Sequence, residues 1–377
     1  MKNKKIAIIG AGIVGATAAF KLAKQGYSVT IFDEGTGQAT AGAAGIICPW
    51  LSQRRNKEWY HLTSTGASYY PLLMAELEKE NVAEIPNKQV GTYVFKHKEQ
   101  QLEKLLKIAQ KRREDAPMIG DLKIVTKEEV AEKIPGWQGQ DGAVFCSGGG
   151  RVDGKLLTEE LLSLAEQYGA TIIREKVSLT LDKERIFVVN GQKSLEFDKI
   201  ILATGAWLKE ILSPLPLSVD VRPQKGQLIE MQMDTTKYHT DDWPVCMLHG
   251  EIDFLPFNNG RIIVGATHEN DQGFDLTPDK ELQNHMYEEV IKLYPALKDY
   301  PIERDRIGTR AYTSDFAPFF GQLADYPQLL VASGLGSSGL TSGAYIGELL
   351  SQIVQDLTPE FPCENYSPAN YIRKNNF

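Results

Sequence analysis

The residues of this chain that most clearly predict a chemistry are the glycines of segment 10–15, Gly-Ala-Gly-Ile-Val-Gly. A short apolar run, residues 6–9, precedes this segment, and a helical pattern follows it over residues 16–25. A second apolar run, residues 29–32, ends at Asp33. Strand, glycine-rich turn, helix, strand and acid is the order that a dinucleotide-binding βαβ unit requires. The sequence therefore predicts a dinucleotide cofactor, with a purely structural glycine turn as the alternative.

Each glycine of this turn has its own predicted task. Gly10 permits the tight turn, Gly12 lets the backbone approach a pyrophosphate, and Gly15 lets helix and strand pack closely. The N-terminus of the helix offers unpaired N–H groups and the positive end of its dipole to the phosphates. Asp33 is placed to accept hydrogen bonds from ribose hydroxyls.

The segment after this acid, residues 35–45, consists almost entirely of glycine, alanine and threonine. It cannot build a core of its own, but its backbone can lie flat against a ligand and donate N–H groups. A flexible linker is the alternative, and the position directly after the predicted ribose-binding acid favours the ligand. The predicted cofactor-binding residues in this part of the chain are Gly10, Gly12, Ile13, Val14, Gly15, Asp33, Glu34, Thr40, Ala41, Ala43, Ala44, Gly45 and Ile46.

The next stretch, residues 52–79, predicts a helix that is interrupted near Gly66 and Pro71. Arg54 and Arg55 stand at its start. Adjacent arginines are most simply explained as solvated, and a role in ligand binding is the alternative.

Further along the chain, turn residues divide a series of predicted helices and strands. Gly148-Gly149-Gly150 predicts a hinge, because no Lys-Ser/Thr follows that would make a phosphate loop. Asn190-Gly191 predicts a hairpin turn, and Thr277-Pro278 predicts a helix with proline at its first position. Arg310 is expected in a loop. The other predicted elements are strands 90–96, 170–177, 199–203, 261–265 and 328–333 and helices 99–113, 155–168 and 340–355.

The composition is that of an ordinary globular protein, with 377 residues, 42% of them hydrophobic and 24% charged. A net charge of −8 argues against nucleic acid or an anionic membrane surface as a partner. The four cysteines and six histidines are scattered, so no metal site and no disulfide framework is predicted.

The first residues, Met1-Lys2-Asn3-Lys4-Lys5, superficially resemble the start of a secretory signal. Cleavage there would delete the first strand and the glycine turn together, so this interpretation is rejected. No run of about twenty apolar residues exists that could span a membrane. We therefore expect a cytoplasmic protein, with peripheral membrane association left open.

Residues 203–207, Ala-Thr-Gly-Ala-Trp, follow a predicted buried strand. Downstream of the N-terminal glycine motif, this segment resembles the D-amino acid oxidase superfamily of FAD enzymes. The family includes glycine oxidase, monomeric sarcosine oxidase and bacterial D-amino acid dehydrogenases. The resemblance spans nearly the whole chain, and its further points are the segment 41–45, Gly226-Gln227, Gly260-Arg261, the segment 264–267, Arg310 with Asp315 and Pro318, and the turn 334–339.

The βαβ unit at the start and the glycine-rich turn near the end predict an α/β fold in which one domain is built from separated segments. With the resemblance, this domain is a Rossmann-like FAD-binding domain. The inserted domain is expected to be an α+β substrate-binding domain built on a largely antiparallel sheet. The expected bounds are 1–85, 150–215 and 305–377 for the first domain, and 86–149 and 216–304 for the second.

The resemblance also implies how FAD binds. The cofactor would be extended, with its pyrophosphate at segment 10–15, its ribose at Asp33 and its adenine against the backbone of Val177. Monomeric sarcosine oxidases tether the flavin to a cysteine in the segment where this chain has Arg310, so non-covalent FAD is expected. The other residues implied to contact the cofactor are Thr204, Gly205, Trp207, Gly334, Gly336, Ser337, Ser338, Gly339, Leu340 and Thr341.

Enzymes of this family oxidise a carbon–nitrogen bond to an imine, with hydride transfer from the α-carbon to flavin N5. Arg310 matches the arginine that binds the substrate carboxylate, a task for which a planar bidentate cation is suited. A salt bridge at the surface or between domains is the alternative. The turn 334–339 can direct N–H groups and a positive helix end at the anionic reduced flavin, and a turn chosen only for packing is the alternative.

Three positions differ from glycine oxidase. Asp253, on the expected strand 251–254, stands in place of a tyrosine, His268 in place of a methionine, and Ser337 in place of a second arginine. These differences put glycine oxidase activity itself in doubt and predict a polar pocket for a cationic or hydroxylated substrate. His268 could accept a proton from the substrate ammonium, or it could be a plain polar residue. Arg310, His268 and Asp253 are the predicted catalytic residues.

The predicted function is the oxidation of an amino acid to its imino acid. The substrate would be a D-amino acid, glycine or an N-substituted small amino acid, and electrons would pass to oxygen or another acceptor. A nicotinamide-dependent dehydrogenase and a flavin-binding homologue without catalysis are the alternatives. The sequence leaves the oligomeric state open.

Overall fold

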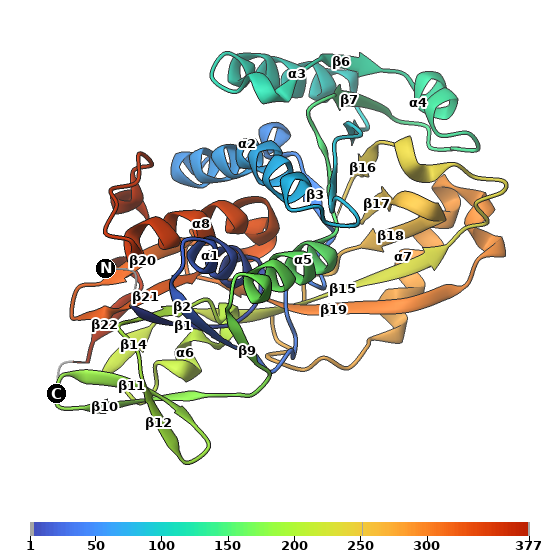
Figure 1. The fold of residues 1–377 in the computed structure, drawn as a ribbon. Coiled ribbons are helices and arrows are strands. Elements are labelled where there is room, and N and C mark those ends of the chain that lie inside the picture. Colours follow the sequence, from blue (N-terminus) through green and yellow to red (C-terminus); the bar gives the residue numbers. More distant parts are fainter. Residues whose placement is uncertain (1–3, 251, 376–377) are drawn as a thin grey trace.

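The fold is described by a computed structural model, which covers residues 4–250 and 252–375. Two large sheets organise it, one beside the two chain ends and one on the far side of the molecule (Figure 1). Two long strands, β15 (Arg222–Gln232) and β19 (Ile302–Tyr312), extend from the middle of the molecule into the second sheet. The region between the sheets therefore receives residues from both.

The first sheet has six strands in the order β20-β21-β13-β1-β2-β9. Neighbouring strands are parallel except β20 and β21, which form an antiparallel pair. The central strands read as apolar runs because helices or loops cover both of their faces. The strands are β1 (Lys5–Ile9), β2 (Ser28–Phe32), β9 (Thr171–Ile173), β13 (Lys199–Leu202), β20 (Phe319–Leu323) and β21 (Tyr326–Ser333).

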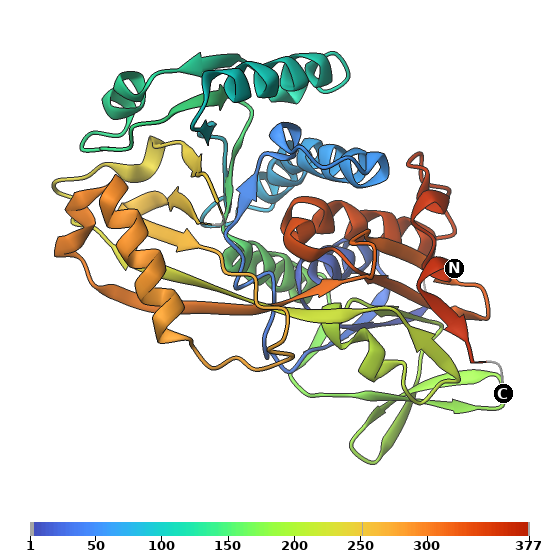
Figure 2. The same cartoon turned by 180° about the vertical axis from the view of Figure 1, so that it is seen from behind.

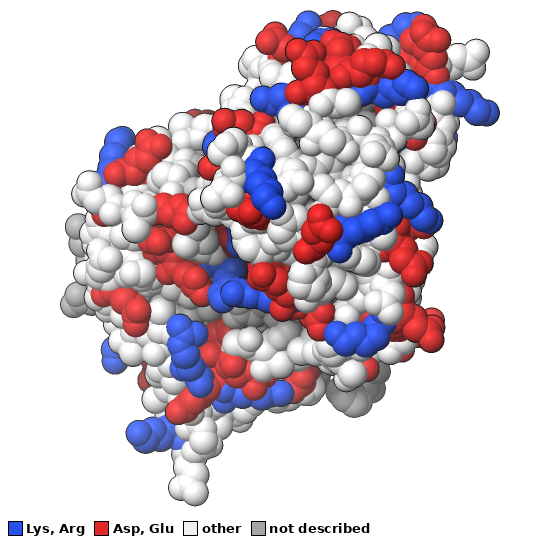
Figure 3. Space-filling model, turned by 90° about the vertical axis from the view of Figure 1, so that its right-hand side faces the viewer, with Lys and Arg blue, Asp and Glu red and all other residues white. Residues whose placement is uncertain are grey.

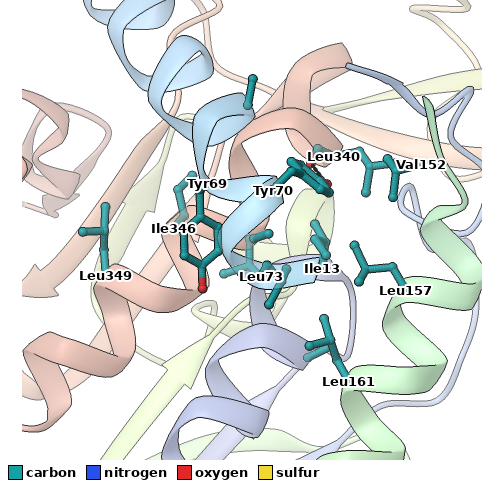
Figure 4. Packing of buried hydrophobic residues seen from close by; sticks show 14 of the residues in the cluster. Ile13, Tyr69, Tyr70, Leu73, Val152, Leu157, Leu161, Leu340, Ile346 and Leu349 are labelled. Atoms are coloured by element: carbon teal, nitrogen blue, oxygen red, sulfur yellow. Dashed lines mark hydrogen bonds between the residues drawn. The ribbon is translucent and has the colours of Figure 1, made fainter. Parts of the chain in front are cut away.

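Four helices pack together over one face of this sheet: α1 (Ile13–Lys24), α2 (Lys57–Lys79), α5 (Gly154–Gln167) and α8 (Gly339–Val354). Figure 4 shows side chains from all four meeting in one cluster, among them Ile13, Tyr70, Leu161 and Leu340. Tyr70 Oη donates a hydrogen bond of 2.6 Å to the carbonyl oxygen of Leu340. This contact fixes the start of α8 against α2.

Smaller elements cover the opposite face of the first sheet and the gap between the two sheets. A short helix, α6 (Leu208–Ile211), and a three-stranded antiparallel sheet pack through their apolar side chains against one buried cluster. The strands of this small sheet are β10 (Ser178–Asp182), β11 (Arg185–Asn190) and β12 (Lys193–Glu196). Two further small sheets are formed by β14 (Leu217–Val219) with β22 (Ile372–Lys374), and by β3 (Ile46–Ile47), β8 (Gly150–Val152) and β4 (Asn87–Lys88).

The second sheet has eight strands in the order β19-β15-β18-β17-β16-β5-β7-β6. It is a mixed sheet, because β5 and β16 run parallel while the other neighbours are antiparallel. This one parallel pair corrects the expectation: the sheet is mixed, although most of its neighbouring strands are antiparallel. Its remaining strands are β5 (Thr92–Lys96), β6 (Leu122–Val125), β7 (Gly142–Cys146), β16 (Val245–Met247), β17 (Asp253–Pro256) and β18 (Arg261–Gly265).

Three helices accompany the second sheet, and Figure 2 shows them from behind. They are α3 (Glu99–Arg113), α4 (Lys127–Lys133) and α7 (Lys280–Leu293). The side chain of Thr126 caps α4 through a capping box with Glu129, and that of Asp279 caps α7. The start of α7 is thus two residues later than the predicted start at Thr277-Pro278.

Three further sequence predictions of local structure were wrong. The helix α2 is continuous through Gly66 and Pro71, because its buried face packs along α8. Gly150 lies in the strand β8 rather than in a hinge. Arg310 lies in β19 rather than in a loop, because its backbone pairs with Gln224 of β15.

Candidate functional site

A cavity of about 520 Å³ lies between the first sheet and one face of the second. Gly10, Asp33 and Ala203 follow the strands β1, β2 and β13, and all three line it. The cavity therefore opens at the carboxyl ends of parallel strands, where ligands bind in open α/β sheets. Of the predicted residues, those that line it are Gly10, Gly12, Ile13, Val14, Asp33, Thr40, Ala43, Ala44, Gly45, Ile46, Thr204, Gly205, Trp207, Asp253, His268, Arg310, Gly336, Ser337, Ser338, Gly339, Leu340 and Thr341.

Three predicted residues lie behind this lining. A Cβ on Gly15 would lie 1.9 Å from the carbonyl oxygen of Gly10, so Gly15 allows α1 to pack against the turn. The carbonyl oxygen of Ala41 accepts a hydrogen bond of 2.8 Å from Arg306. Gly334, with φ of +74°, turns the chain at the end of β21. These residues shape the cavity wall from behind.

Glu34 and Val177 line a neighbouring cavity of about 420 Å³. Asp33 and Thr204 line both cavities, as does Gly10. The two spaces thus adjoin at the carboxyl end of β1. Together they offer room for both ends of an extended dinucleotide.

The glycine turn is built for an anion. Gly10 has φ of +97°, and a Cβ there would lie 2.4 Å from the carbonyl oxygen of Ala203. The helix α1 starts with Gly12 as its N-cap, without a side-chain cap and without an acidic residue in its first turn. The N–H of Ile13 donates to Thr40 Oγ1 at 3.1 Å. The remaining N–H groups of the first turn and the positive helix end are therefore available to phosphates.

The carboxylate of Asp33 is held at the other side of this turn. It accepts hydrogen bonds from the backbone N–H groups of Ala11 and Gly35, at 2.5 Å each, and from Gln38 Nε2 at 2.9 Å. Charge-assisted bonds of this kind fix the orientation of a carboxylate. Asp33 thus presents an oriented acceptor at the edge of the cavity.

Arg310 is fixed from β15 and from the segment after β18. Its Nη1 donates to Gln224 Oε1 at 2.9 Å and to the carbonyl oxygen of Thr267 at 2.8 Å. The guanidinium lies directly over Gly226, where a Cβ would be 2.7 Å from Arg310 Cζ. Gln224 is itself held by Asn270, to which its Nε2 donates at 2.8 Å. The planar group is pre-oriented on a rigid strand, which is what bidentate recognition of a carboxylate needs.

Asp253 and His268 line the same cavity as Arg310. Asp253 opens β17 and pairs with Gly265, and its Oδ1 accepts a hydrogen bond of 3.0 Å from the N–H of Leu248. Glu251, the first residue of the expected strand 251–254, lies outside the described residues. Burial raises the pKa of Asp253 to about 7, although this hydrogen bond and the charge of Lys96 lower it. Asp253 can therefore hold or release a proton near neutral pH.

The raised pKa of Asp253 predicts a pH-dependent stability. The unfolded carboxyl loses its proton near its ordinary pKa of 3.8, whereas the folded one keeps it up to about pH 7. Asp253 should therefore reduce the free energy of unfolding by about 1.4 kcal/mol for each pH unit between about pH 4 and pH 7. Urea denaturation of the wild type and of Asp253→Asn across this range measures the effect. The loss should be smaller in the variant, and parallel curves would contradict the prediction.

The turn before α8 approaches the cavity from the opposite side. Gly336 has φ of +54°, and a Cβ there would lie 2.2 Å from the ring of Tyr312. The N–H of Ser337 donates to Tyr312 Oη at 3.1 Å, and Trp59 Nε1 donates to Ser338 Oγ at 2.9 Å. The helix α8 has no acidic residue in its first turn and no side-chain cap. Its positive end therefore faces the cavity.

Sequence reasoning missed several lining residues. Arg54, expected to be solvated, lines the cavity, stacks on Trp59 at 4.6 Å and donates to the carbonyl oxygen of Phe316 at 2.9 Å. The alternative of a ligand role for Arg54 is the one that its position favours. Thr309 was missed because a threonine next to Arg310 carries no signal in the sequence. Trp59 was also missed, because the hydrogen bond that joins it to Ser338 in the turn before α8 links residues 279 positions apart in the sequence.

As far as the structure describes the chain, the lining of the cavity has unpartnered hydroxyl groups and bare glycine backbone, which suit a flat, extended dinucleotide. Two hydroxyl groups in its lining, Thr204 Oγ1 and Thr309 Oγ1, are buried without a hydrogen-bond partner among the described residues. Buried polar groups are normally satisfied, so these hydroxyls are suited to bond a ligand. Glycines at 10, 226 and 336 line the cavity with bare backbone, and a Cβ at these positions would collide with Ala203, Arg310 and Tyr312 respectively. The lining therefore fits FAD.

Comparison with known proteins identifies the family. The family model described as FAD dependent oxidoreductase, DAO, matches residues 5–353. The chain belongs to this family. It is an FAD-dependent oxidoreductase, and the alternative of a nicotinamide-dependent dehydrogenase is thereby set aside.

Relatives within the DAO family match the chain over its length. It is 40% identical to the uncharacterized oxidoreductase YurR of Bacillus subtilis (98% of this chain, 100% of that protein). It is 27% identical to glycine oxidase of Pseudomonas aeruginosa (98% and 100%). Among solved structures, iminodiacetate oxidase of Chelativorans sp. BNC1 is 34% identical, with a TM-score of 0.92, and the match covers 96% of this chain and 98% of that one.

The described residues of this DAO-family member contain neither a membrane-spanning helix nor a candidate metal cluster. None of its helices within 4–250 and 252–375 combines the length and apolar character that crossing a membrane requires. In the same ranges, no three His, Cys, Asp or Glu residues are grouped so that they could hold a metal ion. Positive and negative side chains are interspersed on the face that Figure 3 displays.

Proposed function

We propose that this FAD-dependent oxidoreductase oxidises the carbon–nitrogen bond of an amino acid to give the imino acid. One observation carries the proposal: the cavity that fits the cofactor is also lined by Arg310, whose guanidinium is held flat against Gly226. A fixed guanidinium binds a carboxylate as a bidentate partner. The substrate therefore carries a carboxylate beside the bond that reacts.

The cofactor would lie along both cavities. We assign the pyrophosphate to the turn 10–15, the ribose to Asp33, and the adenine end to Glu34 and Val177. The flavin ring would lie between segment 43–46 and the turn 336–341. FAD, when bound, supplies the two-electron acceptor for the hydride that leaves the substrate α-carbon.

A non-covalent cofactor is supported by the state of the thiol in the cavity lining. Cys48 lines the cavity, and the hydrogen bond with Cys146 together with burial raises the pKa of Cys48 well above its ordinary value. A thiol kept protonated is a poor nucleophile. Cys246 and Cys363 are not among the residues that line the cavity.

The chain's own residues would do the remaining work. Arg310 orients the substrate through its carboxylate, and Asp253 and His268 face the same space and shape the polar side of the pocket. An ionised Asp253 attracts a substrate ammonium, and a proton can pass to it near neutral pH, as its raised pKa allows. We further propose that segments 86–149 and 216–304 form the substrate-binding domain and the remainder the FAD-binding domain.

The relatives support this class of substrate. One is named glycine oxidase and another iminodiacetate oxidase, and both names describe small amino acids in which one carbon separates the nitrogen from a carboxylate. The positions of Asp253 and His268, which depart from glycine oxidase, favour a substrate with more polar groups than glycine has. We therefore expect an N-substituted or Cα-substituted amino acid.

An anaerobic substrate screen tests the proposed function. The purified yellow protein is mixed without oxygen with glycine, sarcosine, iminodiacetate, proline and both enantiomers of common amino acids. We expect at least one of them to bleach the flavin absorption, and admission of oxygen or of a dye then identifies the electron acceptor. Failure of all of them would favour the alternative of a flavin-binding homologue without catalysis.

A further inference from the structure

A second cavity, of about 710 Å³, lies next to the first. Gly250, Ala266 and His268 line both, so the two spaces meet beside the predicted catalytic residues. The helix α7 contributes His285 and Met286 to its wall. We call this space the side chamber. Its volume lies in the range of pockets that hold an organic ligand.

Two aromatic side chains contribute to one wall of the side chamber. Phe95 and Trp137 line it, and their rings stack with centroids 5.5 Å apart and planes at 26°. Both side chains are almost completely buried. A wall of this kind favours the apolar body of a ligand, and above all a ring that can stack or pack edge-on.

The same wall carries a hydrogen-bond donor that lacks an acceptor in the part of the chain that the structure describes. Trp137 is 5% exposed, and its Nε1 is buried without a partner among the described residues. Gly139 also lines the side chamber, and a Cβ on it would lie 2.6 Å from this nitrogen. Buried indole N–H groups normally find a partner. The donor is therefore suited to an oxygen atom of a ligand in the side chamber.

The carboxylates of the lining and the Lys292 ammonium already have hydrogen-bond or ion-pair partners. Asp141 pairs with His97 at 2.8 Å. Lys292 pairs with Glu289 at 2.5 Å. Glu269 accepts hydrogen bonds from Gln227 at 2.7 Å and from the hydroxyl of Thr267 at 2.6 Å. A ligand with a neutral polar group suits this lining better than one that brings an additional charge.

We propose that the side chamber binds the substituent of the amino acid substrate, and that this substituent has an apolar body and an oxygen atom that accepts a hydrogen bond from Trp137. This proposal rests on the proposed function and narrows its substrate class. Arg310 holds the carboxylate in the first cavity, and the substituent extends past His268 into the side chamber. Glycine and sarcosine would leave the side chamber empty.

Binding of carboxylic acids that lack nitrogen tests the side chamber without catalysis. The probes are propionate, 3-phenylpropionate and 3-(4-hydroxyphenyl)propionate, titrated calorimetrically into the purified FAD-loaded enzyme. The hydroxyphenyl acid should bind about tenfold or more tightly than propionate, because its ring buries apolar surface and its oxygen meets Trp137. Equal affinity for propionate and both aromatic acids would overturn the proposal.

Two tryptophan substitutions on α7 provide a matched pair. His285 lines the side chamber and is exposed, so His285→Trp should fill the space and remove most of the advantage of the aromatic acids over propionate. Asn284 is exposed on the same helix and is not part of the lining, so Asn284→Trp should keep that advantage. An equal effect of the two variants would show that α7 acts only through general packing and would overturn the proposal.

Trp137→Phe keeps the ring wall and removes the donor. It should weaken the hydroxyphenyl acid about fivefold relative to the phenyl acid, as expected for one lost hydrogen bond. Equal weakening of both acids would overturn the assignment of this donor to the ligand.

Oxidation assays with D- and L-tyrosine and N-(4-hydroxybenzyl)glycine, beside sarcosine, keep the two proposals apart. Tight binding without oxidation of any amino acid contradicts only the proposed function, whereas oxidation of sarcosine without aromatic binding contradicts only the side chamber.

Discussion

Replacement of Arg310 by alanine is expected to lower kcat/KM for amino acid substrates by about 100-fold, or about 3 kcal/mol, through the loss of a charge-assisted pair. The guanidinium is held by Gln224 and Thr267 over Gly226, so the wild type loses little entropy when it binds a carboxylate. FAD content should stay normal, because the glycine turn that would hold the pyrophosphate is untouched. Steady-state kinetics and the flavin-to-protein absorbance ratio measure the two effects.

A control for the Arg310 prediction is available on the same strand. Arg304 also belongs to β19 but is exposed and does not line the cavity, so Arg304→Ala should leave kcat/KM within about twofold. A substrate carboxamide adds a second control, because the wild type should discriminate acid from amide while Arg310→Ala should not. If acid and amide respond alike in both enzymes, Arg310 has no role in carboxylate binding.

Replacement of Gly10 by alanine is expected to destabilise the protein and to release the cofactor. The new Cβ would lie 2.4 Å from the carbonyl oxygen of Ala203, at a residue with φ of +97°. Left-handed backbone costs about 1 kcal/mol for alanine, and overpacking adds about 2 kcal/mol, so the free energy of unfolding should fall by about 3 kcal/mol. Urea denaturation and the FAD content of the purified protein measure these changes.

Gly26 offers a matched comparison for the Gly10 prediction. It also has positive φ, +85°, but a Cβ there would meet nothing within 4 Å. Gly26→Ala should therefore show the backbone cost of about 1 kcal/mol alone, with full FAD content. The difference between the two variants isolates the close approach of the turn to Ala203. Similar stability and similar FAD content in both would contradict a special role of this turn.

The features that the sequence predicted well are those whose cause is local. The order of β1, the turn 10–15, α1, β2 and Asp33 follows from residue spacing, because the positive φ at Gly10 and the close approach of Gly15 to Gly10 arise within the unit itself. The predicted hairpin forms between β11 and β12 for the same reason, with its turn at Gly191-Gln192, one residue later than expected. Most of the predicted cofactor residues line one cavity, since the carboxyl ends of parallel strands meet at one edge of a sheet.

The features that it predicted poorly depend on contacts between distant segments. The sequence predicts a loop at Arg310, because the strand β19 that contains it is recognisable only through its pairing with β15. In that pairing Arg310 lies opposite Gln224, 86 positions away in the sequence. Gly66 and Pro71 were expected to interrupt a helix, but packing against α8 outweighs their low helix propensity. Arg54 is held at the cavity by its hydrogen bond to the carbonyl oxygen of Phe316, a residue 262 positions away in the sequence.

By itself, the sequence determined that this protein has a dinucleotide-binding βαβ unit. Together with the family resemblance it also predicted an FAD-dependent enzyme, and the match to the family model established that class. Only the tertiary structure decided which residues share a space with Arg310, and that a side chamber with the donor of Trp137 lies beside Asp253 and His268. The reason is physical. Turn geometry and burial patterns depend on residues that are close together in the sequence, whereas the shape of a cavity is set by the packing of strands and helices that are far apart in the chain.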